Sequence, residues 1–78
     1  MWFVYILKCS DGSFYTGCTI DIDRRIKEHN NHKIHFSKDK TPGSLITYVA
    51  FTDKYRAFEF EKYLKTGSGI AFRNKHLI

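Results

Sequence analysis

The sequence has few of the features that mark secreted, membrane-spanning and disordered proteins. It contains two cysteines and one proline among 78 residues. Two cysteines are too few for the disulfide scaffold of a small secreted domain. No apolar run reaches the roughly 20 residues of a membrane-spanning helix. The opening MWFVYILKC also lacks the basic leader and cleavage site of a signal peptide. These absences favour a reducing cytoplasm and predict no membrane association.

Aromatic and basic residues, in contrast, are plentiful. Aromatic residues make up 17% of the chain, enough to fill the core of a single domain spanning residues 1–78. Thirteen lysines and arginines stand against eight aspartates and glutamates, which gives a net charge of +5. This balance indicates a polyanionic partner such as nucleic acid, or else a solvated basic surface without a partner.

The start of the chain predicts a β-hairpin. Aromatic and β-branched residues fill Trp2–Cys9 and Phe14–Ile20, and Asp11-Gly12 between them is a strong turn signal. Trp2–Cys9 is apolar at both odd and even positions, so both of its faces should be covered. We therefore expect this segment to be the central strand of a layered sheet.

The length of the hairpin turn decides which side chains share a face of the sheet. A two-residue loop at Asp11-Gly12 would put Tyr5 and Tyr15 on opposite faces. A three-residue loop with a bulge at Gly12 would pair Tyr5 with Gly17 and put both tyrosines on one face. We expect the bulged loop, with open space at Gly17 beside the Tyr5 ring.

The rest of the chain predicts a helix, a long basic loop, a strand and two further helices. The first helix is capped by Asp21 and ended by Asn30 and Asn31, and the loop follows at 30–43. The strand covers Ser44–Phe51. The second helix runs from Thr52 or Asp53 to Lys65, and the last helix covers about Ile70–Lys75. Gly67 and Gly69 are expected to end the second helix. The order β-β-α-β-α-α predicts an α/β (α+β) fold, a three-stranded antiparallel sheet flanked by helices.

Polar side chains that could take part in catalysis or binding could meet at one border of this sheet. Arg25 and His29 are four residues apart and share a helix face. Glu61 follows Ala57 by four residues and lies at the edge of an apolar stripe. Each alone has an ordinary role, such as a helix-end histidine or an ion pair between Glu61 and Lys65. The candidate set is Tyr5, Tyr15, Arg25, His29 and Glu61.

Taken together, four segments resemble the GIY-YIG nuclease family over nearly the whole chain. These are Phe3-Val4-Tyr5, Tyr15-Thr16-Gly17, the segment from Asp23 to Asn30, and the segment from Glu61 to Gly69. The similarity is greatest to small stand-alone bacterial members related to the nuclease domain of the excinuclease C subunit. It implies a divalent-metal-dependent endonuclease that hydrolyses phosphodiester bonds in DNA, of the kind used in DNA repair or recombination.

The resemblance implies a role for each matched residue. Glu61 would bind Mg²⁺ or Mn²⁺, and Arg25 would contact the phosphate. Tyr5, Tyr15 and His29 would orient or deprotonate the attacking water, with Tyr5 favoured as the group that activates it. Cys18 stands where excinuclease relatives carry a lysine. The residues expected to contact nucleic acid are Arg25, Lys33, Lys38, Lys40 and Asn74.

Two other interpretations stay open. The first is a non-catalytic nucleic-acid-binding module on the same fold, which basic charge and surface aromatics would serve equally well. The second is a metal site built from Cys9, Cys18 and the histidines, although the eight residues between the cysteines do not fit the close ligand pairs of zinc sites. The substrate could be single-stranded, duplex, branched or damaged DNA, or RNA. A partner protein could supply targeting.

Overall fold

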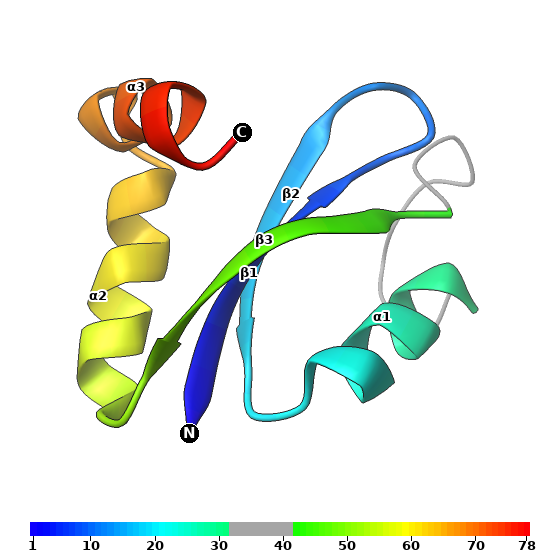
Figure 1. Ribbon diagram of the computed structural model, residues 1–78, viewed down its shortest axis with the longest axis horizontal. Helices are drawn as coiled ribbons and strands as arrows, with labels where there is room; N and C mark the ends of the chain where they lie inside the picture. Colours follow the sequence, from blue (N-terminus) through cyan, green and yellow to red (C-terminus); the bar gives the residue numbers. More distant parts are fainter. Residues whose placement is uncertain (32–41) are drawn as a thin grey trace.

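The computed structural model describes residues 1–31 and 42–78. Its elements are β1 (Trp2–Lys8), β2 (Phe14–Thr19), α1 (Ile22–Asn30), β3 (Ser44–Phe51), α2 (Lys54–Leu64) and α3 (Gly67–His76). The strand order is β2-β1-β3, and β1 pairs antiparallel with both neighbours (Figure 1). The predicted three-stranded antiparallel sheet with the first strand central is therefore confirmed.

The central strand is covered on both faces, as its sequence pattern requires. Four successive residues of β1, from Val4 to Leu7, are buried. On one side α2 and α3 cover the sheet, and α1 lies on the other side (Figure 1). The apolar core forms on the α2 side, where Val4 and Ile6 pack with Ala57 and Leu64. The opposite face carries the odd-numbered side chains of β1.

The hairpin turn is the bulged one. Gly12 has a φ of +87°, a conformation that favours glycine. The register pairs Tyr5 with Gly17 and Leu7 with Tyr15, so both tyrosines share one face. The expected open space at Gly17 is not there, because the Tyr5 ring and hydroxyl lie against the glycine. A side chain at position 17 would collide with that ring, so Gly17 is needed to admit it.

Local capping sets the limits of the first two helices. Asp21 accepts a hydrogen bond from the Arg24 backbone N–H at 3.1 Å, and α1 begins at Ile22, directly after Asp21. Asp53 caps α2 by accepting from the Tyr55 N–H at 2.9 Å. At its far end α1 is fixed by Asn30, whose Oδ1 accepts from the Gly43 N–H at 2.7 Å. The end of α1 is therefore tied to the chain just before β3.

The start of α3 differs from the prediction. The helix begins at Gly67 rather than Ile70, because Thr66 caps it by accepting from the Gly69 N–H at 3.1 Å. Gly67 and Gly69 thus lie in the first turn of α3 and do not end α2. A Cβ at Gly69 would overlap with the backbone of Tyr63 and Leu64. The glycine therefore lets α3 pack closely on the end of α2.

Several predictions concern the loop between α1 and β3. Lys33, Lys38 and Lys40 lie outside the described residues. Among residues 1–31 and 42–78, no helix has the length and apolar character needed to cross a membrane. Both cysteines are free thiols, with Cys9 buried and Cys18 half-buried.

Candidate active site

Four of the predicted side chains lie together on the α1 side of the sheet. The bulged hairpin brings the Tyr5 and Tyr15 rings to a centroid distance of 6.2 Å. The Tyr15 ring meets the His29 ring edge-on, with centroids 4.8 Å apart. The Arg25 guanidinium hydrogen-bonds the Tyr5 phenol. We call Tyr5, Tyr15, Arg25 and His29 the tyrosine–arginine cluster.

The α-helical repeat explains why α1 supplies two members of this cluster. Arg25 and His29 are four residues apart, so both point from the same face of α1 toward the sheet. His29 lies in the last turn and is only 1% exposed. The Asp21 cap and the Asn30 tie fix the two ends of this short helix. The position of both side chains is therefore set by local structure at each end.

Burial governs the ionisation of Tyr5. The side chain is 1% exposed. Burial is the main cause that raises its pKa to about 12, and the neighbouring Tyr15 adds to the rise, while the hydrogen bond and charge of Arg25 oppose it. A nearby guanidinium favours the phenolate and so lowers the pKa of a tyrosine, and Arg25 has that effect on Tyr5. Desolvation outweighs it, so Tyr5 stays protonated at neutral pH.

Arg25 and His29 carry opposite shifts with different causes. The hydrogen bond to Tyr5 raises the pKa of Arg25 despite partial burial, so the guanidinium stays charged. Burial, and then the charge of Arg25, lowers the pKa of His29, so the imidazole is neutral at physiological pH. Arg25 Nε is buried and has no hydrogen-bond partner within the described residues. Because buried donors are normally paired with protein, water or ligand, this atom is a donor that is open to an acceptor from outside the described residues.

Glu61 lies across β2 from this cluster. It belongs to the sheet-facing stripe of α2, four residues after Ala57 and three before Leu64. Burial raises the pKa of the Cys18 thiol, and the nearby charge of Glu61 raises it further. Cys18 and Tyr15 are three apart on a strand, so their side chains point to opposite faces. The predicted site therefore spans the edge strand β2, with four residues on one side and the carboxylate on the other.

Glu61 forms an ion pair with a residue of its own helix. Its Oε2 accepts a hydrogen bond from Lys65 Nζ at 3.0 Å, and the Glu61 side chain keeps about a quarter of its surface exposed, 23%. This is the ion pair that the ordinary interpretation of Glu61 predicts. However, an ion pair alone does not explain why a carboxylate lies on the face of α2 that covers the core, because such pairs form equally well on the outer face.

Arg73 is a candidate that the sequence analysis missed. Its Nη2 and Nε donate to Asn74 Oδ1 at 3.0 and 3.2 Å. Its guanidinium lies 5.1 Å from the centre of the Phe14 ring. Phe14 and Cys18 are four apart on β2 and share the Glu61 side of the sheet. Because Arg73 follows buried Gly69 by four residues, helical spacing from the correct start of α3 would have revealed its inward position.

The residues present fit a magnesium-type ion better than a closed metal site. Within the described residues, no group of three His, Cys, Asp or Glu side chains could hold a metal ion. This removes the metal site from Cys9, Cys18 and His29 or His76; His32 and His35 lie outside the described residues. Mg²⁺ usually keeps several waters and binds one or two carboxylates together with substrate phosphates. One accessible carboxylate, Glu61, meets that requirement.

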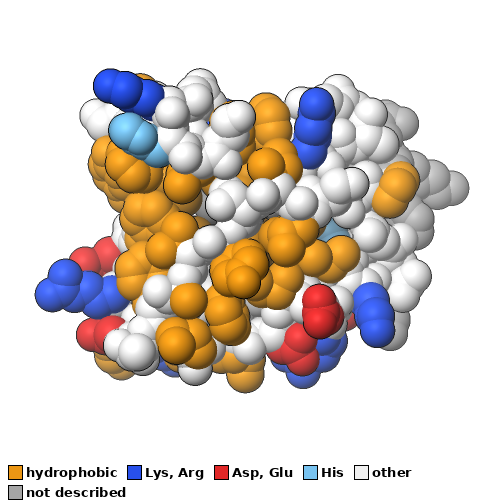
Figure 2. Space-filling model, in the orientation of Figure 1, with side chains coloured by type: hydrophobic (Ala, Val, Ile, Leu, Met, Phe, Trp, Pro, Cys, Tyr) orange, Lys and Arg blue, Asp and Glu red, His pale blue; other side chains and the backbone are white. Residues whose placement is uncertain are grey.

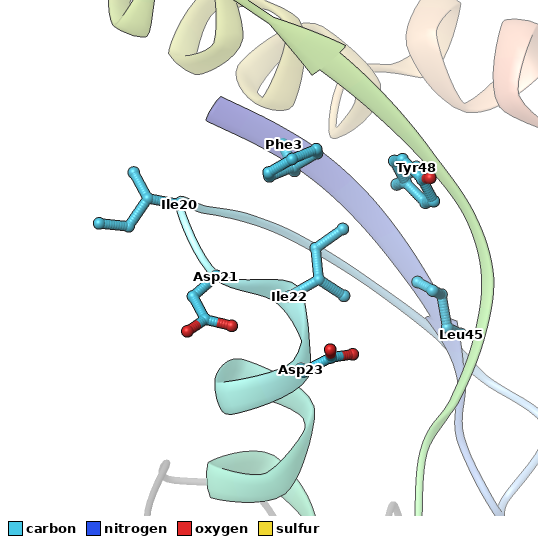
Figure 3. A pocket seen from close by; sticks show the side chains of 7 residues that line it. All are labelled: Phe3, Ile20, Asp21, Ile22, Asp23, Leu45 and Tyr48. Carbon is cyan, nitrogen blue, oxygen red and sulfur yellow. The ribbon is translucent and has the colours of Figure 1, made fainter. Parts of the chain in front are cut away.

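A separate pocket of about 330 Å³ opens on the α1 side of the sheet. Phe3, Ile22 and Tyr48 point toward one another across it (Figure 3). Its lining residues are Phe3, Ile20, Asp21, Ile22, Asp23, Leu45 and Tyr48. Two carboxylates at its wall would repel a phosphate, so the pocket does not suit a nucleic-acid backbone. None of the predicted site residues lines it.

Comparisons with known proteins agree with this architecture. Residues 1–72 match the family model described as the GIY-YIG catalytic domain. The UPF0213 protein BH0048 of Halalkalibacterium halodurans is 44% identical over 64 residues, which cover 81% of this chain and 68% of the relative. The UPF0213 protein SERP0126 of Staphylococcus epidermidis is 42% identical over 65 residues, covering 82% and 79%. The NMR structure of BH0048, from Bacillus halodurans, superposes with a TM-score of 0.59 at 37% identity, covering 96% of this chain and 84% of that one.

Proposed function

Because the chain belongs to the GIY-YIG catalytic domain family, we propose that it is a divalent-metal-dependent endonuclease that hydrolyses phosphodiester bonds in DNA. The observation that carries this proposal is the tyrosine–arginine cluster. Burying a guanidinium, an imidazole and phenols lowers stability unless the groups are well paired. In a domain of 78 residues, a cluster in which the pKa values of Tyr5, Arg25 and His29 are all shifted indicates a functional site.

Arg25 is the proposed phosphate-binding residue. Its positive charge persists at every physiological pH, because the Tyr5 hydrogen bond raises its pKa. Phosphodiester hydrolysis increases the negative charge on the phosphate oxygens. A guanidinium held in place before the reaction stabilises that charge without reorganising. The buried Nε, which has no hydrogen-bond partner within the described residues, is the donor we assign to a phosphate oxygen.

Tyr15 and His29 are the proposed pair that orients the attacking water and accepts its proton. Tyr15 is half-buried and reaches the surface, whereas Tyr5 does not. His29 is as buried as Tyr5, but its neutral imidazole can accept a proton and its ring meets that of Tyr15, so we assign it the role of taking the proton by way of Tyr15. A fully buried phenol with a pKa of about 12 is a poor candidate for the base. We therefore move the role favoured for Tyr5 to this pair and assign Tyr5 the task of positioning Arg25.

Glu61 is the proposed metal ligand. Its carboxylate lies on the sheet-facing side of α2 and remains partly exposed. Mg²⁺ or Mn²⁺ held there would add positive charge beside the phosphate oxygens. Lys65 competes for the same carboxylate in the ion pair, so it would have to release Oε2 when the ion binds. Asn74, held by Arg73, is a proposed nucleic-acid contact, together with Lys33, Lys38 and Lys40.

We propose DNA repair or recombination in the cytoplasm as the setting, because the chain belongs to the GIY-YIG catalytic domain family. A domain of this size contacts few bases, so specificity would come from the shape of the DNA or from a targeting protein. The alternative function, a nucleic-acid-binding module without catalysis, would use the same basic surface.

The decisive experiment compares two glutamates of α2. The purified protein is incubated with single-stranded, duplex and branched DNA and with RNA, in Mg²⁺, Mn²⁺ or EDTA. Glu61→Gln should abolish cleavage while leaving the fold and most DNA binding intact, because it removes the carboxylate charge and keeps the shape. Glu59→Gln is the matched control, since Glu59 is exposed on the same helix, and it should cleave at the wild-type rate.

Two outcomes would contradict the proposal. If Glu61→Gln cleaves as fast as the wild type in Mg²⁺, the metal ligand is misassigned. If the wild type binds DNA but cleaves none of the substrates with any ion, the protein is a binding module. Circular dichroism of each variant serves as the control for folding.

A further inference from the structure

Aromatic rings remain open to solvent at the corner where α2 meets α3. Tyr63 is 41% exposed and Phe72 is 36% exposed. Their ring centroids are 6.1 Å apart, and the His76 ring lies 4.8 Å from Phe72. We call Tyr63, Phe72 and His76 the aromatic corner. Figure 2 shows basic, histidine and hydrophobic side chains close together at the upper left, over α3.

Packing of α3 on α2 does not account for this exposure. The joint between the helices is already filled by half-buried Phe60, which contacts Phe51 on its inner side at 5.5 Å between centroids. Phe60 also contacts Tyr63 at 6.4 Å and Phe72 at 6.3 Å. Tyr63 and Phe72 therefore form an outer layer that rests on Phe60. An outer layer of exposed rings presents flat surfaces to a ligand.

The charges around the aromatic corner select the kind of ligand. Within the described residues, the cations nearest to the corner in sequence that have no ion pair or ring contact are Lys62 on α2 and Lys75 on α3, whereas Lys65 is paired with Glu61 and Arg73 lies over Phe14. The acidic residue closest to them in sequence, Glu61, is already paired with Lys65. Cations interleaved with exposed rings suit a polyanion that carries flat groups. A nucleic-acid strand with unpaired bases has that chemistry, since its phosphates meet the cations and its bases stack on the rings.

The aromatic corner lies on the same helix as the proposed metal ligand. Tyr63 follows Glu61 by two residues, so the two side chains leave α2 on different sides, within about one helical turn of each other. We propose that the aromatic corner stacks unpaired bases of the strand that carries the scissile phosphate, so that the substrate is DNA with a single-stranded segment. This inference rests on the proposed nuclease function, because Glu61 marks where the phosphate lies.

Single-stranded DNA is favoured over duplex by the same geometry. In a duplex both faces of each interior base are occupied by neighbouring bases, so protein rings cannot stack on them. An unpaired base keeps a free face and needs no unstacking from a partner strand. The exposed rings thus add affinity for unpaired strands only, whereas the cations add affinity for both forms.

Binding in EDTA tests this inference separately from cleavage. Fluorescence anisotropy is measured with a labelled single-stranded DNA, the matching single-stranded RNA and a blunt DNA duplex at one fixed salt concentration. Tyr63→Ala and Phe72→Ala should each raise the Kd for single-stranded DNA by about 5- to 100-fold. The Kd for the duplex should change by less than about 2-fold, since stacking does not contribute to it.

Three further variants control for folding and for loss of an exposed ring in general. Tyr55→Ala removes a ring that is 71% exposed at the far end of α2, and it should bind every probe like the wild type. Phe72→Tyr keeps an aromatic face and should keep single-strand affinity. Phe72→Leu keeps apolar volume and should lose it. If Phe72→Ala loses its circular dichroism spectrum, Phe72→Leu and Tyr63→Ala decide the question.

Failure of this inference differs from failure of the nuclease proposal. Equal losses on single strand and duplex, or no loss beyond that of Tyr55→Ala, would overturn the stacking assignment even in an active nuclease. A loss confined to the RNA probe would overturn DNA as the substrate. An inactive wild-type protein whose single-strand preference depends on Tyr63 and Phe72 would refute only the nuclease proposal.

Discussion

The two faces of the sheet differ in the chemistry of the side chains that they bury. On the α2 side, Val4, Ile6, Ala57 and Leu64 form a continuous apolar core. On the α1 side, the tyrosine–arginine cluster places phenols, a guanidinium and an imidazole against the same central strand. The α2 face therefore carries the continuous apolar core, while the α1 face combines the buried apolar side chain of Leu7 with polar groups whose burial opposes folding.

This comparison shows how a small domain can support a polar site. β1 contributes to both faces, because alternate side chains of a strand point in opposite directions. Its even positions anchor the core, and Tyr5 at an odd position anchors the cluster. Substitutions on the α2 face should therefore affect stability first, and substitutions on the α1 face should affect activity or pH dependence first.

The largest effect is expected in the apolar core. Leu64→Ala should lower the free energy of unfolding by about 2 to 5 kcal/mol, because it leaves a cavity beneath α2. Leu45→Ala is the matched control on the α1 side, where Leu45 is exposed, and it should cost less than about 1 kcal/mol. Urea denaturation measures both. Equal losses would show that stability is shared evenly by the two faces.

The next effect concerns activity on the α1 face. Arg25→Ala should reduce single-turnover cleavage by about 10²- to 10³-fold, because it removes a fixed charge from the phosphate, and it should weaken DNA binding. Arg24→Ala is the control, since Arg24 points away from the cluster and pairs with Glu28 at 3.6 Å. A similar loss of cleavage in both variants would mean that only net charge matters, and the cluster would lose its assigned role.

The smallest effect appears at alkaline pH. The pKa of Tyr5 is raised to about 12 in the folded protein, against about 10 when unfolded, so ionisation favours the unfolded state. The contribution of the neutral phenol to the free energy of unfolding is fully present below pH 10 and is lost as the pH rises from 10 to 12. The loss is up to about 2 to 3 kcal/mol.

Comparison of two phenylalanine variants isolates this contribution. Tyr5→Phe should flatten the fall in unfolding free energy above pH 10, whatever its effect at pH 7. Tyr48→Phe, at an exposed position of β3, should keep the wild-type pH dependence. The measurement is urea denaturation at several pH values. An unchanged slope in Tyr5→Phe would contradict the burial of a neutral phenol at this position.

Most of the fold could be predicted because its signals are local. The Asp21 and Asp53 caps, the glycine bulge at Gly12 and the doubly apolar β1 each act within a few residues or within one hairpin. The start of α3 is the exception. Gly67 and Gly69 are typical helix terminators and predict an end of α2, but the Thr66 cap places them in the first turn of α3. Here too the missed signal was local.

The candidate site was predictable only in part. Residue identity and spacing brought Tyr5, Tyr15, Arg25 and His29 into one group, since hairpin register and helical repeat determine which side chains share a face. They did not place Glu61 across β2 from that group. Helical spacing from Gly69 gives the inward direction of Arg73 but not its contact with Phe14. That contact depends on how α3 packs on the sheet, as the place of Glu61 depends on how α2 packs.

The sequence by itself determined the order of the elements, the central strand, the register of the hairpin and the set of chemically capable residues. Only the tertiary structure decided how those residues ionise and which of them reach solvent. The physical reason is that desolvation depends on atoms brought together from distant parts of the chain. The burial of Tyr5 between α1 and the sheet makes its phenol a weak acid, while Tyr15, ten residues later on the same face, remains within reach of water.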